Sequence, residues 1–198
     1  VHAAGHLHAG VLAQVTRVAD IPTLIVVGAR GSGKTTLLAR LLDGRPPDER
    51  VAVLLNERGR TVLSAREGVT PAEIEPGCVC CTAQVSLRVA LTRLLREARP
   101  RRLYIELAEG THLRDALRTL RNPWLAPVLR IAGVLGVVGG RRVTDDEAMA
   151  AWLADLTAVV LGSDTSGAAG ALIASLRPGL RVIAADAPAD AILSAAGS

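Results

Sequence analysis

The feature that most constrains this chain is a glycine-rich stretch set between an apolar run and a helical pattern. Residues Gly28 to Thr35 read GARGSGKT and fill every fixed place of the pattern G-x-x-x-x-G-K-[ST]. The apolar run 23–27 precedes this stretch, and the helical pattern 36–42 follows it. A strand, a glycine loop and a helix in this order place backbone N–H groups around an anion at the positive end of a helix. The segment therefore predicts a phosphate-binding loop.

The residue types in this loop indicate how a nucleotide would be held. Lys34 adds a positive charge near the β and γ phosphates, and the Thr35 hydroxyl is placed to ligate Mg²⁺. The other candidate nucleotide-binding residues are the glycines of the loop and two residues with hydroxyl groups: Gly28, Gly31, Gly33, Ser32 and Thr36. The loop therefore predicts a nucleotide-binding protein that takes GTP or ATP together with Mg²⁺.

All the cysteines of the chain fall within four positions, as Cys78, Cys80 and Cys81. Thiolates are soft ligands that suit Zn²⁺ and related transition metals, and three of them leave one position of a tetrahedral ion open. Two other interpretations stay open, a disulfide and burial as small apolar residues. The odd count and the lack of a visible export signal argue against a disulfide. We expect a transition-metal site that carries and releases its ion.

Length and composition indicate a globular protein. The chain has 198 residues, of which 49% are apolar, enough for one domain with a full core. We expect residues 21–198 to form the nucleotide-binding domain and residues 1–20 to be a lead-in. His2, His6 and His8 fall in this lead-in, where a mobile terminus is a more common explanation than a metal site. The apolar stretches are too short to cross a bilayer and no leader is visible, which predicts a soluble, cytoplasmic protein with no membrane partner.

The basic charge of the chain does not point to nucleic acid. The formal net charge is +4 and the pI is about 9.6, but the arginines are scattered and aromatic residues make up only 2%. Proteins that bind single strands stack bases on aromatic side chains, which are scarce here. We therefore expect no nucleic-acid partner, and a basic surface that is solvated or attracts a polyanionic nucleotide.

Apolar runs alternate with helical patterns along the chain. The runs lie at 51–55, 103–106, 131–138, 157–161 and 181–185. This alternation predicts an α/β fold of the P-loop NTPase kind, with a mainly parallel sheet flanked by helices on both faces. Glu106 ends one of these runs, at the edge of the sheet where ligands gather; a solubilising charge at a strand end is the alternative explanation.

Four motifs together carry a resemblance to a known family. They are the phosphate loop, Asn56-Glu57-x-Gly59, Gly77-Cys78-x-Cys80-Cys81, and Glu106 at a strand end. In order and spacing the chain resembles the CobW-type metallochaperone GTPases, relatives of the nickel-insertion GTPases for urease and hydrogenase. The resemblance runs from about residue 21 to residue 185 and covers only the nucleotide-binding part of such proteins.

The resemblance implies a function and roles for residues. GTP and Mg²⁺ binding would be coupled to the delivery or homeostasis of Zn²⁺, Co²⁺ or a similar metal, handed to a metal-receiving apoprotein. Lys34 and Glu106 would be the catalytic residues, with Glu106 as the Walker B carboxylate. The three cysteines would be the metal thiolates.

The chain also departs from this family. The resemblance predicts a base-reading Asn-Lys-x-Asp motif, but the chain has Gly162-Ser163-Asp164-Thr165 at that place. Asp164 remains as a candidate acceptor of hydrogen bonds from the guanine base. Whether the chain prefers GTP or ATP stays open. Glu109 takes the place of a glycine after the Walker B carboxylate, and Gly139 takes the place of an aspartate. Three functions follow: a slow P-loop GTPase that traffics metal, a non-hydrolysing module whose metal affinity is gated by nucleotide, and a small-molecule P-loop kinase, which leaves the cysteines unexplained.

Overall fold

The computed structural model describes residues 20–55, 63, 66–74, 81–107, 113–139, 153–163 and 167–197. Its strands are β1 (Ile21–Val27), β2 (Val51–Leu55), β3 (Val69–Glu73), β4 (Arg102–Glu106), β5 (Leu129–Val138), β6 (Ala158–Leu161) and β7 (Arg181–Ala184). Its helices are α1 (Lys34–Asp43), α3 (Cys81–Ala98), α4 (Leu113–Leu120), α6 (Gly167–Leu176) and α7 (Ala189–Gly197).

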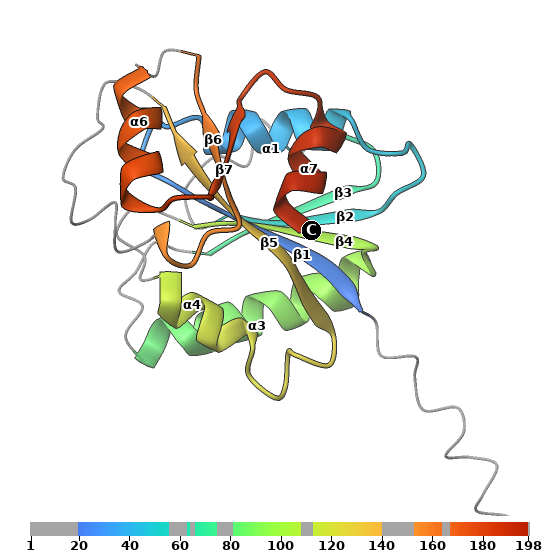
Figure 1. Cartoon of the computed structure of the whole chain (residues 1–198). Helices are drawn as coiled ribbons and strands as arrows, with labels where there is room; N and C mark the ends of the chain where they lie inside the picture. The colour runs from blue at the N-terminus through green and yellow to red at the C-terminus, as the bar shows by residue number, and fades with distance from the viewer. Residues whose placement is uncertain are drawn as a thin grey trace, which may run out of the picture.

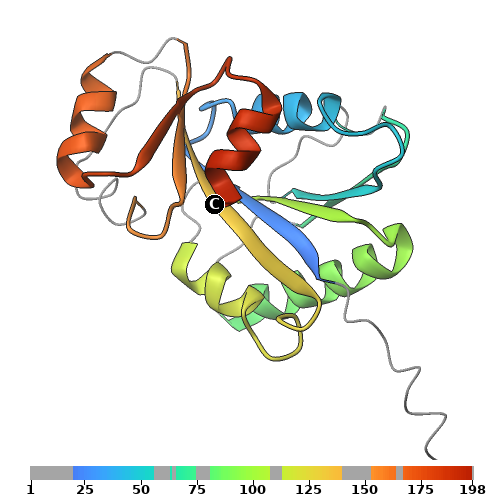
Figure 2. The same cartoon turned by 45° about the vertical axis from the view of Figure 1, so that its right-hand side comes forward.

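The strands form one seven-stranded sheet in the order β3-β2-β4-β1-β5-β6-β7, and all six pairings between neighbours are parallel. Helices cover both faces (Figures 1 and 2). Helices α1 and α7 pack on one face, and α3, α4 and α6 pack on the other. The predicted α/β fold with a parallel sheet between helical layers is therefore confirmed.

The sequence explains why the central strands lie where they do. Every residue of β2 is buried, which is the pattern of a strand covered on both faces. On α3, Leu87, Leu91 and Leu94 recur at helical spacing and are buried against the sheet, as an amphipathic helix requires. The two faces thus build two apolar clusters, one on each side of the sheet.

Two elements and some boundaries differ from the sequence-based expectation. Strand β3 was not predicted. It lies at the edge of the sheet and pairs with one neighbouring strand, so the missing N–H of Pro71 breaks no hydrogen bond to a second strand. Helix α7 was also not predicted. Strand β5 begins at Leu129 rather than at residue 131. Residues 1–19 of the expected lead-in lie outside the described residues.

Helix α7 packs closely over the middle of β5. A Cβ built on Gly133 would lie 2.3 Å from the Ala196 carbonyl oxygen, so only a glycine permits this approach.

None of the helices in the described ranges combines the length and the apolar character that a bilayer crossing requires.

The strand order brings the phosphate loop and Glu106 to the same edge. Strands β1 and β4 are parallel neighbours whose register pairs Val26 with Glu106. The Leu107 N–H donates to the Val26 carbonyl oxygen at 2.9 Å, which continues the pairing past the end of β4. The loop that follows β1 therefore begins beside the last residue of β4.

Candidate functional site: the loop between β1 and α1

The loop owes its shape to two glycines in the left-handed region. Gly31 has φ +78° and Gly33 has φ +98°, a conformation that other residues adopt only with strain. A Cβ built on either would meet nothing within 4 Å, so backbone conformation, not space, requires these glycines. Gly33 is the N-cap of α1 and makes no side-chain cap. The first N–H groups of α1 are thus left for an anion, as in a phosphate-binding loop.

Lys34 lies inside the loop. It is only 3% exposed, and its Nζ donates to the carbonyl oxygens of Gly28 and Ala29, each at 3.0 Å. A buried ammonium is tolerated only when it is hydrogen-bonded. It is also the only lysine in the chain. The loop therefore fixes a positive charge among the backbone groups that would surround a phosphate.

Thr35 and Glu106 face each other at the start of α1. The Thr35 hydroxyl donates to the Glu106 carboxylate, at 3.2 Å from Oε1 and 3.1 Å from Oε2, and Glu106 is 2% exposed. Hydroxyl and carboxylate oxygens are the ligand types that Mg²⁺ takes in nucleotide sites. The pair therefore offers oxygen ligands that would fit a Mg²⁺ ion, and the roles expected for both residues stay predictions.

The loop packs against the end of β5. A Cβ on Gly28 would lie 2.4 Å from the Val137 carbonyl oxygen, and one on Gly139 would lie 2.5 Å from the Ser32 carbonyl oxygen. Neither position has room for a side chain. The glycine found where the resemblance predicts an aspartate is thus one that the neighbouring loop requires. This contact had no signal in the sequence, because it depends on how closely two distant segments approach.

The other predicted nucleotide-binding residues are placed as follows. Ser32 is 5% exposed, and its hydroxyl has no hydrogen-bond partner within the described part of the chain. Thr36 is exposed on α1. Asp164 lies outside the described residues, so its role at the base stays a prediction.

The predicted metal thiolates come directly before α3 and at its first residue. Cys78 and Cys80 lie outside the described residues, and Cys81 is described only as the first residue of α3. Across the described ranges, no cluster of three or more His, Cys, Asp or Glu residues could hold a metal ion. The cysteine metal site stays a prediction.

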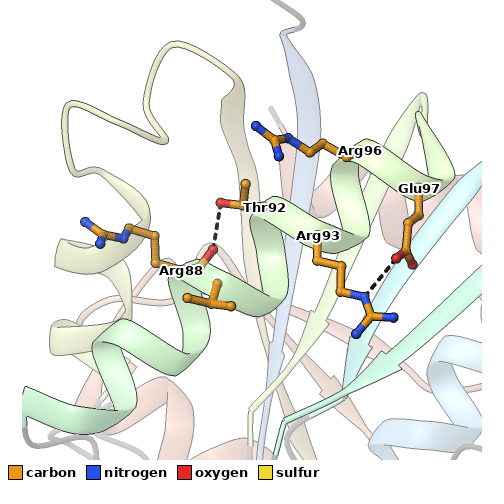
Figure 3. A pocket seen from close by; sticks show the side chains of 6 residues that line it. Arg88, Thr92, Arg93, Arg96 and Glu97 are labelled. Atoms are coloured by element: carbon orange, nitrogen blue, oxygen red, sulfur yellow. Dashed lines mark hydrogen bonds and ion pairs between the residues drawn. The ribbon is translucent and has the colours of Figure 1, made fainter.

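A hollow of about 510 Å³ lies on the outer side of α3 (Figure 3). Its lining residues all come from this helix: Arg88, Val89, Thr92, Arg93, Arg96 and Glu97. Arg93 Nε and Glu97 Oε1 form an i,i+4 ion pair at 2.8 Å, and the Thr92 hydroxyl donates to the Arg88 carbonyl oxygen at 2.8 Å. The hollow contains none of the residues predicted to bind nucleotide or metal.

Comparison with known proteins matches the nucleotide-binding part of one family. The family model described as "CobW/HypB/UreG, nucleotide-binding domain" matches residues 22–161. The zinc chaperone YeiR of Escherichia coli (strain K12) is 35% identical over 129 residues, which cover 63% of this chain and 39% of YeiR. The zinc chaperone CobW of a Sinorhizobium species is 28% identical over 134 residues, covering 62% of this chain and 38% of that protein. The chain thus spans about two fifths of these curated relatives.

Solved structures share the fold. The hydrogenase maturation factor HypB from Archaeoglobus fulgidus superposes with a TM-score of 0.62 at 16% identity, covering 88% of this chain and 87% of HypB. The Zn(II)-bound YjiA GTPase from E. coli superposes with a TM-score of 0.54 at 19% identity, covering 83% of this chain and 57% of YjiA.

Proposed function

Because the chain belongs to the CobW/HypB/UreG family of nucleotide-binding domains, we propose that it is a nucleotide-dependent metal-trafficking protein. It binds a nucleoside triphosphate, GTP in preference to ATP, at the loop from Gly28 to Thr36. The observation that carries this proposal is the pairing of the Thr35 hydroxyl with the Glu106 carboxylate beside the buried Lys34 ammonium. One buried cation, uncapped N–H groups and hard oxygen donors then converge on one place, as a Mg²⁺-triphosphate requires.

The metal half of the proposal rests on the cysteine segment and on the relatives. Cys78, Cys80 and Cys81 supply thiolates suited to Zn²⁺, Co²⁺ or a similar ion. The names of the two curated relatives as zinc chaperones support zinc as the cargo. The ion is handed to a metal-receiving apoprotein.

In this proposal, the chain contributes mainly by positioning and charge, as is general for phosphoryl transfer. The Lys34 ammonium offsets charge on the β and γ phosphates. Thr35 and Glu106 would hold Mg²⁺, which would supply positive charge to neutralise the phosphates. We expect hydrolysis to be slow without a partner, because these residues stabilise charge and none of them is assigned to activate water.

Phosphate release and nucleotide binding, measured on the same samples, test the proposal. The chain and its Lys34→Ala variant would be given GTP or ATP with Mg²⁺, each with and without Zn²⁺. Release above the variant's level supports a hydrolase. Release equal to the variant's level, with nucleotide still bound, supports a non-hydrolysing module. The absence of nucleotide binding would overturn the proposal.

Coupling between the two ligands has its own test. If Zn²⁺ changes the affinity for nucleotide by some factor, nucleotide must change the affinity for Zn²⁺ by the same factor. Calorimetric titrations in both orders measure these two factors. Titrations that are independent of each other would show that the protein does not couple metal to nucleotide.

A further inference from the structure

The outer side of α3 is a basic surface that faces away from the sheet. Leu87, Leu91 and Leu94 are buried on the inner side of this helix, so the positions between them face outward. Arg88 and Arg96 are exposed on the outer side. They are eight positions apart, which is about 12 Å or two turns along an α-helix. The helix therefore holds two positive charges at a fixed spacing.

The hollow on this surface contains more positive than negative charge. Its lining has one carboxylate, Glu97, and Glu97 Oε1 is already paired with Arg93 Nε at 2.8 Å. Figure 3 shows Arg93 turned toward Glu97, whereas the side chains of Arg88 and Arg96 extend away from this pair. Neither of these two guanidinium groups forms a hydrogen bond or ion pair within the described part of the chain. The surface is therefore complementary to an anionic partner.

The other lining residues favour a protein partner over a nucleic acid. Val89 is 58% exposed, and it gains from contact only with an apolar group, which a protein side chain supplies. The Glu97 carboxylate repels phosphate groups, and the lining has no aromatic side chain on which a base could stack. A protein segment that carries both carboxylates and an apolar side chain matches the whole surface.

The surface also lies on the helix that follows the cysteine segment. Helix α3 begins at Cys81, the last of the predicted metal thiolates. Arg88 comes seven positions later, about 10 Å along the helix. A protein segment bound along the outer side of α3 is thus held close to the end of the helix from which the metal would be released.

We propose that the outer side of α3 is the docking surface for an acidic segment of the metal-receiving apoprotein, with Arg88 and Arg96 as the main contacts. The inference rests on the proposed function, from which it takes the kind of partner. It adds the surface on this chain and the charge of the segment that binds there.

Fluorescence polarisation with synthetic ligands tests the inference. The probe is a labelled helical peptide with a glutamate and a leucine in each turn, and two comparison peptides have glutamine or lysine in place of glutamate. A labelled single-stranded RNA is the further ligand. The variants are Arg88→Ala, Arg96→Ala and a double variant with Arg88→Glu and Arg96→Glu.

The control is a second double variant, with Arg118→Glu and Arg130→Glu. These arginines lie on α4 and β5, and their side chains are 74% and 54% exposed. The control therefore changes the net charge by the same amount as the α3 double variant, but away from α3.

We expect the wild-type chain to bind the glutamate peptide, more weakly as the salt concentration rises, and to bind the glutamine and lysine peptides far less. Arg88→Ala and Arg96→Ala should each weaken the glutamate peptide about threefold, and the α3 double variant should weaken it more than about tenfold. The α3 double variant should in turn bind the lysine peptide. The control variant should change the affinity for the glutamate peptide less than about twofold.

Three results would overturn the inference: no binding of the glutamate peptide, equal weakening in the control variant, or RNA binding that is tighter than peptide binding and is lost in the α3 double variant. Nucleotide and Zn²⁺ titrations test the proposed function separately. Both affinities should be the same in the α3 double variant as in the wild-type chain, because neither arginine belongs to the predicted nucleotide or metal site. Thermal unfolding shows whether each variant is folded, and if the α3 double variant is not, the two alanine variants still decide.

Discussion

The Thr35 hydroxyl donates to both carboxylate oxygens of Glu106, at 3.2 and 3.1 Å, although the two residues stand 71 positions apart in the sequence. The sheet order explains the contact. Strand β4 is inserted next to β1 in register with it, so the last residue of β4 meets the first turn of the helix that follows β1. The two oxygen groups that we propose as Mg²⁺ ligands are thus brought together by topology.

Replacing Glu106 by Gln should separate metal-assisted from metal-free nucleotide binding. The amide keeps the shape but loses the charge that Mg²⁺ requires. We expect the affinity for nucleotide to fall about tenfold or more in Mg²⁺ and to change little in a chelator. Titrations in both buffers measure this. A Glu97→Gln variant on the outer side of α3 is the control, and equal loss in both buffers would contradict a role through the metal.

Replacing Lys34 by Ala should abolish the stabilisation that nucleotide gives to the fold. A ligand at about a hundred times its dissociation constant stabilises a protein by roughly 2.7 kcal/mol. We expect this gain in the wild-type chain and almost none in the variant, which loses the charge at the β and γ phosphates. Thermal unfolding with and without nucleotide measures it. A variant that gains as much as wild type would show that Lys34 does not hold phosphate.

The phosphate loop and the central strands could be predicted from the sequence because the conformational and burial preferences of neighbouring residues determine them. Gly31 and Gly33 need positive φ, and glycine adopts this conformation without strain. The all-apolar β2 indicates a strand covered on both faces. The position of Glu106 followed from the rule that parallel strands end at a common edge.

The unpredicted features depend on contacts that no local pattern encodes. Strand β3 contains Pro71 and its residues are only half buried, so it shows neither alternation nor a continuous apolar run. Its strand character comes from pairing with β2. The requirement for glycine at position 139 likewise arises from the Ser32 carbonyl oxygen of a distant loop.

Replacing Gly139 by Ala should disturb the loop from the β5 side. The new Cβ would lie 2.5 Å from the Ser32 carbonyl oxygen, so the loop backbone must shift. We expect a loss of about 1–3 kcal/mol in unfolding free energy and weaker nucleotide binding. Urea denaturation and calorimetry measure the two effects.

The matched control for this substitution is Gly170→Ala. Gly170 lies inside α6, and its Cβ would make only an ordinary contact with Leu161 at 3.6 Å. Alanine there should stabilise the helix by about 0.5–1 kcal/mol. If Gly139→Ala were equally harmless, the close packing of the loop on β5 would be refuted.

Replacing Tyr104 by Phe should not destabilise the protein at neutral pH. Tyr104 is fully buried, and its hydroxyl has no hydrogen-bond partner among the described residues. Removing an unpaired buried hydroxyl is neutral or gains about 1 kcal/mol. Urea denaturation measures this, and a loss above about 1 kcal/mol would mean that the hydroxyl is hydrogen-bonded in solution.

The same substitution should change the alkaline limit of stability. Burial raises the pKa of Tyr104 from 10.0 to about 12, because the phenolate is disfavoured away from water. The unfolded chain therefore loses this proton at a lower pH than the folded chain. The stability that the group contributes is present below about pH 10 and is lost as the pH rises toward 12. Tyr104→Phe should remove this part of the loss of folding stability at alkaline pH.

Replacing Asp43 by Asn should weaken the link between the end of α1 and the segment before β3. Arg66 donates from Nε to Asp43 Oδ1 at 2.6 Å and from Nη2 to Oδ2 at 3.0 Å. These bonds lower the pKa of Asp43 below 3.8 and offset the unfavourable position of a carboxylate at a helix C-terminus.

A carboxyl group whose pKa is lowered by folding stabilises the protein above its unfolded pKa and loses this effect as the pH falls through its folded pKa. The Asp43 side chain is 62% exposed, so we expect Asp43→Asn to cost less than about 1 kcal/mol at neutral pH. The difference should shrink as the pH falls through the lowered pKa of Asp43 in the folded protein. Urea denaturation of Asp43→Asn, Arg66→Gln and the double variant measures the coupling between the two residues. A coupling energy of zero at neutral pH would show that the ion pair contributes nothing, because the double variant would then lose the sum of the two single losses.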